Sequence, residues 1–457
     1  MDPEKIIKYA EDKGAQYAEI RIIRSWEWGL NIRNMTTERV VGGVDEGVGV
    51  RVLMNNAWGF SSSSVIDSWK DVVDMAVKFG MISSKNTDKK IILGKGKTAT
   101  GRYEIPARIK FDSVTPEDKI ENLMDFSSSA MDNKILKSIT GGYSEWRRET
   151  EYMNSEGISF ISVVPRVVMQ SMLSGKDGEK SMMYRVRFGG TGGYELLKGI
   201  DFNEEGRSSA DRLMTILHGS AAPTGKIDVV SDPELTGVFV HEAVGHATEA
   251  DLVTSGDSVL EDKIGVKIGK DEVTIYDDPT MKNAFGSYPV DDEGTLAQRK
   301  ILIENGVLKR FMTDRETAGE LGVNSTGNAR GESYSSIPLI RMSNTMMGKG
   351  DYKPEEIFED IKFGVYAKGT RGGQVDTAVG SFQFNSQEAY LIENGEITKP
   401  IFDFSLGGNI MKILNNIEKV GKDEMYGTPG YCGKGQIVPV GDGGPTIMIK
   451  NVISGGG

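Results

Sequence analysis

The pattern of apolar and polar positions in the first half of the chain predicts a mixture of helices and strands. Apolar residues recur at helical spacing in three stretches that we expect to form amphipathic helices, 3–13, 66–80 and 116–133. Alternation of apolar and polar residues predicts strands at 17–25 and 28–34, and a Gly-interrupted strand at 44–64 with a turn at Asn55-Asn56. Residues 135–190 also alternate, with Gly-containing turns such as 154–157. This half of the sequence therefore indicates an α+β arrangement.

The pattern changes after a helix predicted at 207–217. A Pro- and Gly-containing linker, HGSAAPTGK (218–226), follows that helix, and the remainder reads mostly as strands. Two near copies, LIENGVLKRFM (302–312) and LIENGEITKPI (391–401), place Asn-Gly between apolar runs, which predicts a hairpin at each. They are either two unrelated hairpins or traces of a duplicated subdomain.

We therefore predict an α+β fold with two domains. Residues 1–220 would form a mixed helix and sheet N-terminal domain, and residues 221–457 a β-rich C-terminal domain carrying the metal-binding helix described below.

Composition narrows the class of protein. The 457 residues are 38% hydrophobic and 26% charged, as in soluble globular proteins. A net charge of −12 disfavours a nucleic-acid partner, which requires a cationic surface. No apolar run approaches the roughly 20 residues that span a bilayer, and the first residues, MDPEKIIKYAEDKG, lack the apolar core of a signal peptide. We expect a cytoplasmic protein without a membrane partner.

The stretch HEAVGH (241–246) contains two of the three histidines of the chain. It is similar to the zinc-protease pattern His-Glu-x-x-His, but with one extra residue. On an ideal helix, residues five apart differ by about 140°, so the rings of His241 and His246 would point apart. A π-bulge, or a turn loosened at Gly245, would bring them to one face. We therefore predict a distorted helix at a metal site.

A catalytic zinc ion takes three protein ligands and keeps one open position. Cys432 is a candidate for the third ligand, because a thiolate suits zinc and its glycine neighbours allow close approach. His218 is better explained as a cation at a helix C-terminus. The acidic candidates are Glu249, Asp251, Asp291 and Asp292.

Glu242 adjoins a ligand position, where a carboxylate can act as general base and then as general acid in metal-assisted hydrolysis. Two other functions stay open. The chain could be a non-catalytic interaction or modulator protein with a structural metal, although such a site needs no base. It could also be a zinc amidase or deacylase acting on small substrates.

Several longer segments match one known family. They are HEAVGHATEADL (241–252), VDDEGTLAQRKILIENGVL (290–308), STGNARGESYSSIPLIRMSNTMM (325–347), RGGQVDTAVGSFQFNSQEAYLIENGEITKPI (371–401) and CGKGQIVPVGDGGPTIMIKNVISGGG (432–457). Through them the chain resembles the TldD/PmbA family of metalloproteases over essentially its whole length. The pattern His-Glu-x-x-x-His marks the catalytic, TldD-type subunit of that family.

The resemblance implies a zinc-dependent peptidase that acts on unfolded or extended peptides. It implies Zn²⁺ ligands at His241, His246 and Cys432, with Glu242 as the catalytic residue. It also implies a dimer, often a heterodimer with a metal-free homologous subunit of the PmbA (TldE) type.

Two further segments have alternative interpretations. The Gly-rich stretch GGQVDTAVGSFQF (372–384) could pair with an extended peptide, or form an ordinary core hairpin. Tyr334 and Arg341 could contact substrate or stabilise an oxyanion, or could make structural hydrogen bonds.

Overall fold

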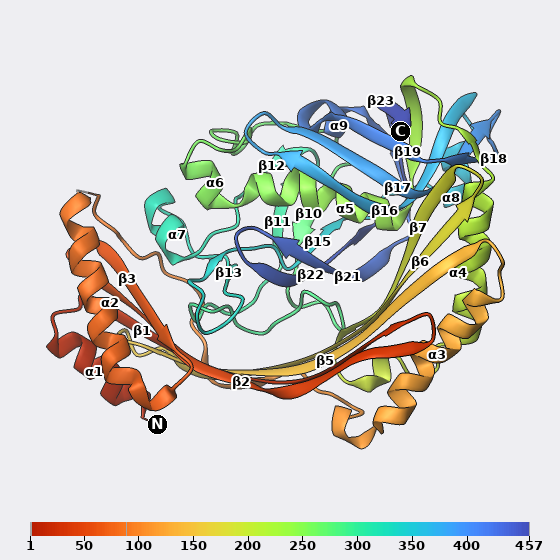
Figure 1. Ribbon diagram of the computed structural model, residues 1–457. Helices are drawn as coiled ribbons and strands as arrows, with labels where there is room; N and C mark the ends of the chain where they lie inside the picture. The colour runs from red at the N-terminus through yellow and green to blue at the C-terminus, as the bar shows by residue number, and fades with distance from the viewer. Residues whose placement is uncertain (1, 88, 457) are drawn as a thin grey trace.

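The N-terminal part is built on a long, curved sheet. The computed structural model describes residues 2–87 and 89–456. The sheet has the strand order β3-β2-β1-β5-β6-β4, with β7 also paired to β6. The strands are β1 (Tyr17–Arg33), β2 (Thr36–Met54), β3 (Ala57–Ser63), β4 (Thr100–Glu104), β5 (Leu136–Asn154), β6 (Ser159–Asp177) and β7 (Lys180–Thr191). Figure 1 shows that the sheet is strongly curved and that the C-terminal part lies on its concave side.

Tight turns fold these long strands back on one another. Asn55 and Asn56 have φ values of 49° and 65°, which Asn tolerates better than most residues, and they join β2 to β3 as predicted. The prediction of separate strands at 17–25 and 28–34 was wrong, because β1 runs unbroken through both. Trp26 and Glu27 between them stay extended and pair with β2 and β5.

Helices cover both ends of the curved sheet. They are α1 (Pro3–Asp12), α2 (Trp69–Ser83), α3 (Pro116–Met131) and α4 (Phe202–Leu217). α1 and α2 lie at one end and α3 and α4 at the other (Figure 1). Side-chain caps fix their starts: Thr115 accepts a hydrogen bond from the Asp118 N–H, and Asp201 from the Glu204 N–H. All four predicted helices are confirmed within a few residues.

Two larger sheets and a small two-stranded one form the C-terminal part. One has the order β12-β11-β10-β15-β22-β21, and the other β16-β9-β23-β19-β17-β18-β8, with β20 paired to β23. The first comprises β10 (Ile275–Asp277), β11 (Lys300–Glu304), β12 (Val307–Leu308), β15 (Asn344–Met347), β21 (Met425–Gly433) and β22 (Ile437–Gly444). The second comprises β8 (Ser220–Ala221), β9 (Gly225–Ser231), β16 (Phe363–Asp376), β17 (Ser381–Glu393), β18 (Glu396–Phe402), β19 (Phe404–Asn409), β20 (Ile417–Val420) and β23 (Ile447–Gly456).

Both Asn-Gly hairpins are confirmed, but they lie in different sheets. Asn305-Gly306 joins β11 to β12, and Asn394-Gly395 joins β17 to β18; all four residues have positive φ. Because the two hairpins have different surroundings, the duplicated subdomain stays a hypothesis. The smaller elements are β13 (Ala329–Arg330), β14 (Leu339–Ile340), α6 (Ala250–Thr254), α7 (Arg315–Leu321), α8 (Pro354–Phe358) and α9 (Ile410–Asn416).

The helix α5 (Pro233–Val240) lies between the two C-terminal sheets, in contact with β15 and β22 of one and β16 of the other (Figure 1). Apolar residues of the helix and of both sheets form one continuous core. The predicted α+β fold with a β-rich C-terminal part is confirmed, whereas the division of the chain after residue 220 stays a prediction. Within the described residues, the structure contains no helix long and apolar enough to cross a bilayer.

Candidate metal centre

The helix that carries the two histidines changes its geometry at the first of them. Asp232 caps α5 by accepting a hydrogen bond from the Leu235 N–H at 2.9 Å. After Val240 the chain forms a π-helical turn over His241–Gly245, and the His246 N–H donates to the His241 carbonyl five residues earlier. The predicted distortion is therefore confirmed. The π-helical turn brings side chains five positions apart closer to one face of the helix.

Glycine is required at position 245 because another side chain occupies the space. A Cβ added to Gly245 would lie 1.9 Å from the Met342 sulfur. Met342 is fully buried, so neither group has free room to move. The turn can therefore pass close to its neighbour only without a side chain at position 245.

We expect Gly245→Ala to lower the free energy of unfolding by about 1–3 kcal/mol, the usual cost of an overpacked core. Gly43→Ala is the matched control, because a Cβ at Gly43 meets nothing within 4 Å. Urea unfolding measures both. The Met342→Ala background, which removes the clashing sulfur, should reduce the cost of Gly245→Ala; an unchanged cost there would show that the clash is not the cause.

Three side chains with metal-binding atoms converge beside this turn. The ligand atoms of His241, His246 and Cys432 all lie within 4.8 Å of one another, and all three residues are buried. The Cys432 Sγ, on β21, is 3.3 Å from the His246 Nε2. The two imidazole rings are perpendicular, with centroids 5.4 Å apart. Residues 186 positions apart in the chain, His246 and Cys432, are thus brought together by the packing of α5 against the β21–β22 hairpin.

This donor set fits a zinc ion. Two ligands at normal Zn–N and Zn–S distances in tetrahedral geometry lie about 3.6 Å apart, close to the observed sulfur–nitrogen distance. The buried Nδ1 of His241 has no hydrogen-bond partner among the described residues. A buried imidazole nitrogen without a partner is costly unless something binds it. Two imidazoles and one thiolate leave a fourth tetrahedral position open.

The three groups also shift one another's protonation. Burial alone would raise the pKa of the Cys432 thiol, but His241 and His246 outweigh burial and lower it to about 4. Burial alone would lower the pKa of His241, but Cys432 and Glu242 raise it to about 9. The opposite charges therefore favour a thiolate beside protonated imidazoles, and a metal ion that binds there would displace the imidazole protons.

Glu249 orients one of the rings. Its carboxylate lies 2.9 Å from the Nδ1 of His246, and Lys434 lies 3.1 Å from the same carboxylate oxygen. Burial raises the pKa of Glu249, but His246 and Lys434 outweigh burial and lower it. The carboxylate therefore points the Nε2 of His246 at Cys432, as partners of metal-bound histidines commonly do. Lys434, two residues after Cys432, was not identified from the sequence.

The other acidic candidates lie away from the three ligand atoms. Asp251 pairs with Lys434 at 2.8 Å. Asp291 accepts main-chain hydrogen bonds, and Asp292 pairs with Arg148; both line a separate cavity. Among the described residues, only His241, His246 and Cys432 form a cluster of this kind.

Three further residues considered in the sequence analysis make structural contacts. His218 follows the last residue of α4, is exposed and lies 3.2 Å from Asp177, at the predicted helix C-terminus. Arg341 is fully buried and donates to the Cys432 carbonyl, so it holds the strand that carries the thiol. Tyr334 packs against β2 at Gly47, outside the cluster. For Arg341, the interpretation as a structural donor is therefore correct.

Comparison with known proteins agrees with this architecture. Models described as PmbA/TldA metallopeptidase domain 1, central domain and C-terminal domain match residues 18–79, 109–217 and 224–456. A metalloprotease of Methanocaldococcus jannaschii is 41% identical over 99% of this chain and all of its own length. A zinc metalloprotease TldD homolog of Saccharolobus solfataricus is 34% identical over 99% of both chains. The crystal structure of TldE from Thermococcus kodakarensis has a TM-score of 0.80, at 19% identity and 99% coverage of both chains.

The fold and the site define a class of α+β proteins in which a distorted His-Glu-x-x-x-His helix lies against a cysteine-bearing hairpin. The chain belongs to the PmbA/TldD metallopeptidase family. Its relatives are named metalloproteases, which supports a peptidase role.

Proposed function

We propose that this chain is a zinc-dependent peptidase that hydrolyses peptide bonds in unfolded or extended chains. The observation that carries the proposal is the convergence of His241, His246 and Cys432 around one point, with a partnerless buried nitrogen on His241. The zinc metalloprotease name of the Saccharolobus relative also supports zinc. The three residues would be the metal ligands.

Glu242 is the proposed general base. Its carboxylate lies 3.9 Å from the His246 Nε2, and its side chain is 26% exposed, the most open of the groups in the site. Zn²⁺, when bound, supplies a Lewis acid that polarises a scissile carbonyl and acidifies water. The Glu242 carboxylate would take the proton of the attacking water and then deliver it to the leaving amine.

An unpaired strand edge near the helix supports an extended substrate. β16 pairs with β9 only over Gly364–Ala367 and continues to Asp376 with β17 as its neighbour. Among the described residues, no strand pairs with the other edge of 370–376. Main-chain groups on such an edge can bind an extended peptide with little dependence on sequence. Folded proteins would not present such a strand.

We also propose a dimer, with a metal-free homologous subunit of the PmbA (TldE) type as one possible partner, in the cytoplasm. The high structural similarity to a TldE protein supports such a partner. Val40, Val41 and Val44 on β2 are exposed apolar residues, which suits a surface covered by another subunit.

Elemental analysis combined with casein cleavage tests the proposal. We expect about one zinc per chain and cleavage of unfolded casein that a chelator abolishes, measured alone and with a co-expressed homologous partner. Cys432→Ala should lose the zinc, whereas His218→Ala, at the exposed histidine, should keep it. Full zinc in Cys432→Ala would assign the third ligand to another residue.

The same assay separates the two alternative functions. Zinc without cleavage under any pairing would favour a modulator protein with a structural metal. Cleavage of small acyl amides but not of casein would favour an amidase or deacylase.

A further inference from the structure

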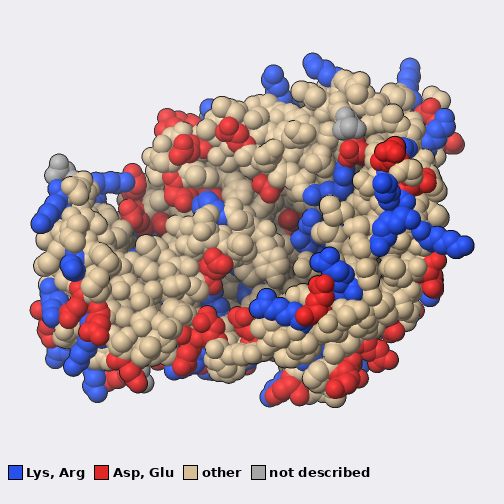
Figure 2. Space-filling model, in the orientation of Figure 1, with Lys and Arg blue, Asp and Glu red and all other residues tan. Residues whose placement is uncertain are grey.

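A cavity of about 410 Å³ lies between the curved sheet and the C-terminal part. Figure 2 shows the surface hollowed there, with acidic and basic side chains around the opening. Strands β1, β5 and β6 form one wall, and C-terminal segments form the other. The latter include residues 288, 290–292, 330–332, 431 and 437–439.

Two buried arginines line this cavity without an acidic partner. Arg166 and Arg330 are 5% and 7% exposed. Each donates two hydrogen bonds, all to main-chain carbonyls at 2.6–2.8 Å. Within the described residues, no carboxylate lies within 4.0 Å of either guanidinium group. A guanidinium has five N–H donors, so each retains capacity for a further acceptor.

Three arginines and five carboxylates line the cavity, so a preference for an anion rests on the two arginines that lack an acidic partner. A third arginine, Arg148, is already paired with Asp292 at 3.3 Å. Asp291 is buried, and its carboxylate accepts hydrogen bonds from main-chain N–H groups. Burial, and then the charges of Arg330 and Arg148, lower the pKa of Arg166 to about 9. A bound anion would relieve this repulsion.

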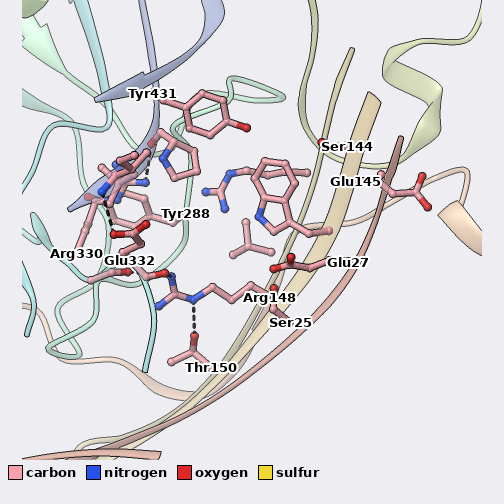
Figure 3. A pocket seen from close by; sticks show the side chains of 18 of the residues that line it. Ser25, Glu27, Ser144, Glu145, Arg148, Thr150, Tyr288, Arg330, Glu332 and Tyr431 are labelled. Carbon is pink, nitrogen blue, oxygen red and sulfur yellow. Dashed lines mark hydrogen bonds between the residues drawn. The ribbon is translucent and has the colours of Figure 1, made fainter. Parts of the chain in front are cut away.

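Aromatic side chains surround the same space. Trp146, Tyr288 and Tyr431 line the cavity, and the ring of Tyr288 lies 4.9 Å from the Arg330 guanidinium carbon. Figure 3 shows Arg148, Arg330, Tyr288 and Tyr431 around one open space, with Glu27 across from them. An occupant with an apolar body next to its anionic group fits these walls.

Acidic residues at the opening limit the charge of that occupant. Glu27 and Glu332 are exposed and line the cavity near its mouth. They would repel a multiply charged anion such as phosphate, or a nucleic acid, more strongly than a single carboxylate. Carboxylates can also accept hydrogen bonds from the N–H groups of a peptide.

The cavity is distinct from the metal centre. Tyr431 and Pro439 are directly paired on β21 and β22 and line the cavity. Cys432 is the next residue on β21 and is buried in the C-terminal core. Because successive residues of a strand point to opposite faces, the side chains of Tyr431 and Cys432 lie on opposite faces of the hairpin. Val438, the pairing partner of Cys432, also lines the cavity, so the two sites are adjacent across this hairpin, but none of the three ligand residues lines the cavity.

We propose that this cavity binds the C-terminal carboxylate of a peptide whose last residue is aromatic or large and apolar. Arg166 and Arg330 hold the carboxylate, and Trp146 and Tyr431 pack against the side chain. Such carboxylates are what hydrolysis of a peptide bond produces, but binding here requires no hydrolysis at the metal centre. The site can therefore exist even if the proposed peptidase function fails.

Isothermal titration calorimetry on the full chain tests this site, with Glu242→Ala as background so that no ligand is consumed. N-acetylphenylalanine should bind at least about tenfold more tightly than its amide, the difference that about 1.4 kcal/mol provides. Arg166→Gln and Arg330→Gln should each weaken binding of the acid by a similar factor. The control Arg102→Gln, at a half-exposed arginine of β4, should leave it unchanged.

Equal binding of the acid and the amide, or displacement of the acid by inorganic phosphate at equal concentration, would overturn the proposal. If the arginine variants fail to fold, Tyr431→Ala tests the site instead, because Tyr431 is a half-exposed residue of the cavity wall. This variant should weaken the binding of N-acetylphenylalanine at least severalfold. Unchanged affinity in that variant would remove the cavity as the binding site.

Discussion

Replacing Glu242 by glutamine is expected to reduce casein hydrolysis by about 10²–10⁴-fold, the usual contribution of a general acid–base group. Zinc content should stay at the level of the unsubstituted protein. Glutamine keeps the shape of the side chain but cannot take a proton from water. The partly exposed carboxylate lies beside His246 and outside the cluster formed by the two imidazoles and the thiolate, so the metal would not depend on it.

Casein cleavage and elemental analysis on the same preparation check this expectation. Glu261→Gln is the matched control, because Glu261 is an exposed residue with no role in the cluster, and it should behave as the unsubstituted chain. Loss of zinc in Glu242→Gln would make Glu242 a ligand. Full activity with full zinc would assign the proton transfer to another group.

Local sequence signals predict the elements of this fold well, because the forces that form them act over a few residues. Asn55-Asn56, Asn305-Gly306 and Asn394-Gly395 adopt the left-handed backbone that their residue types permit, and each ends a strand. Helices begin at capping residues such as Thr115. The unbroken β1 was missed because Trp26 and Glu27 lie between the two alternating runs, yet pairing on both sides holds them extended.

Some features of the metal centre also follow from local sequence, whereas others do not. The π-helical turn follows from the spacing of His241 and His246, because two rings five positions apart reach one point only if the helix is distorted. In contrast, no local signal shows that Arg341 holds the Cys432 carbonyl, because these residues lie 91 positions apart in the chain. Glu249 lies only three residues after His246, but the sequence offered it as a metal ligand and not as the partner of the His246 Nδ1. The cavity between the two parts likewise exists only after they pack together.

A second large effect is expected at a buried ion pair on two strands of the sheet that also contains β21 and β22. Lys300 on β11 and Asp277 on β10 are fully buried, with 2.8 Å between the ammonium nitrogen and the carboxylate oxygen. Lys300→Met should lower the free energy of unfolding by about 3–5 kcal/mol, because it leaves the Asp277 carboxylate buried without a counter-ion. Lys309→Met, just after β12 in the same β11–β12 hairpin, is the matched control. It breaks an exposed pair with Glu304 and should change stability by less than about 1 kcal/mol.

The pH dependence of the Lys300→Met deficit tests its cause. Burial would raise the pKa of Asp277, but Lys300 and Ser343 outweigh burial and lower it, so the pair stabilises the protein at neutral pH and loses this contribution as pH falls. Without Lys300, burial should raise the Asp277 pKa, and protonation at acidic pH should relieve the unpaired charge. The deficit in urea unfolding should therefore shrink below about pH 5, and Asp277→Asn added to Lys300→Met should restore part of it at pH 7. A deficit independent of pH, and unchanged in the double variant, would mean that lost packing of the lysine stem, and not the charge, causes the destabilisation.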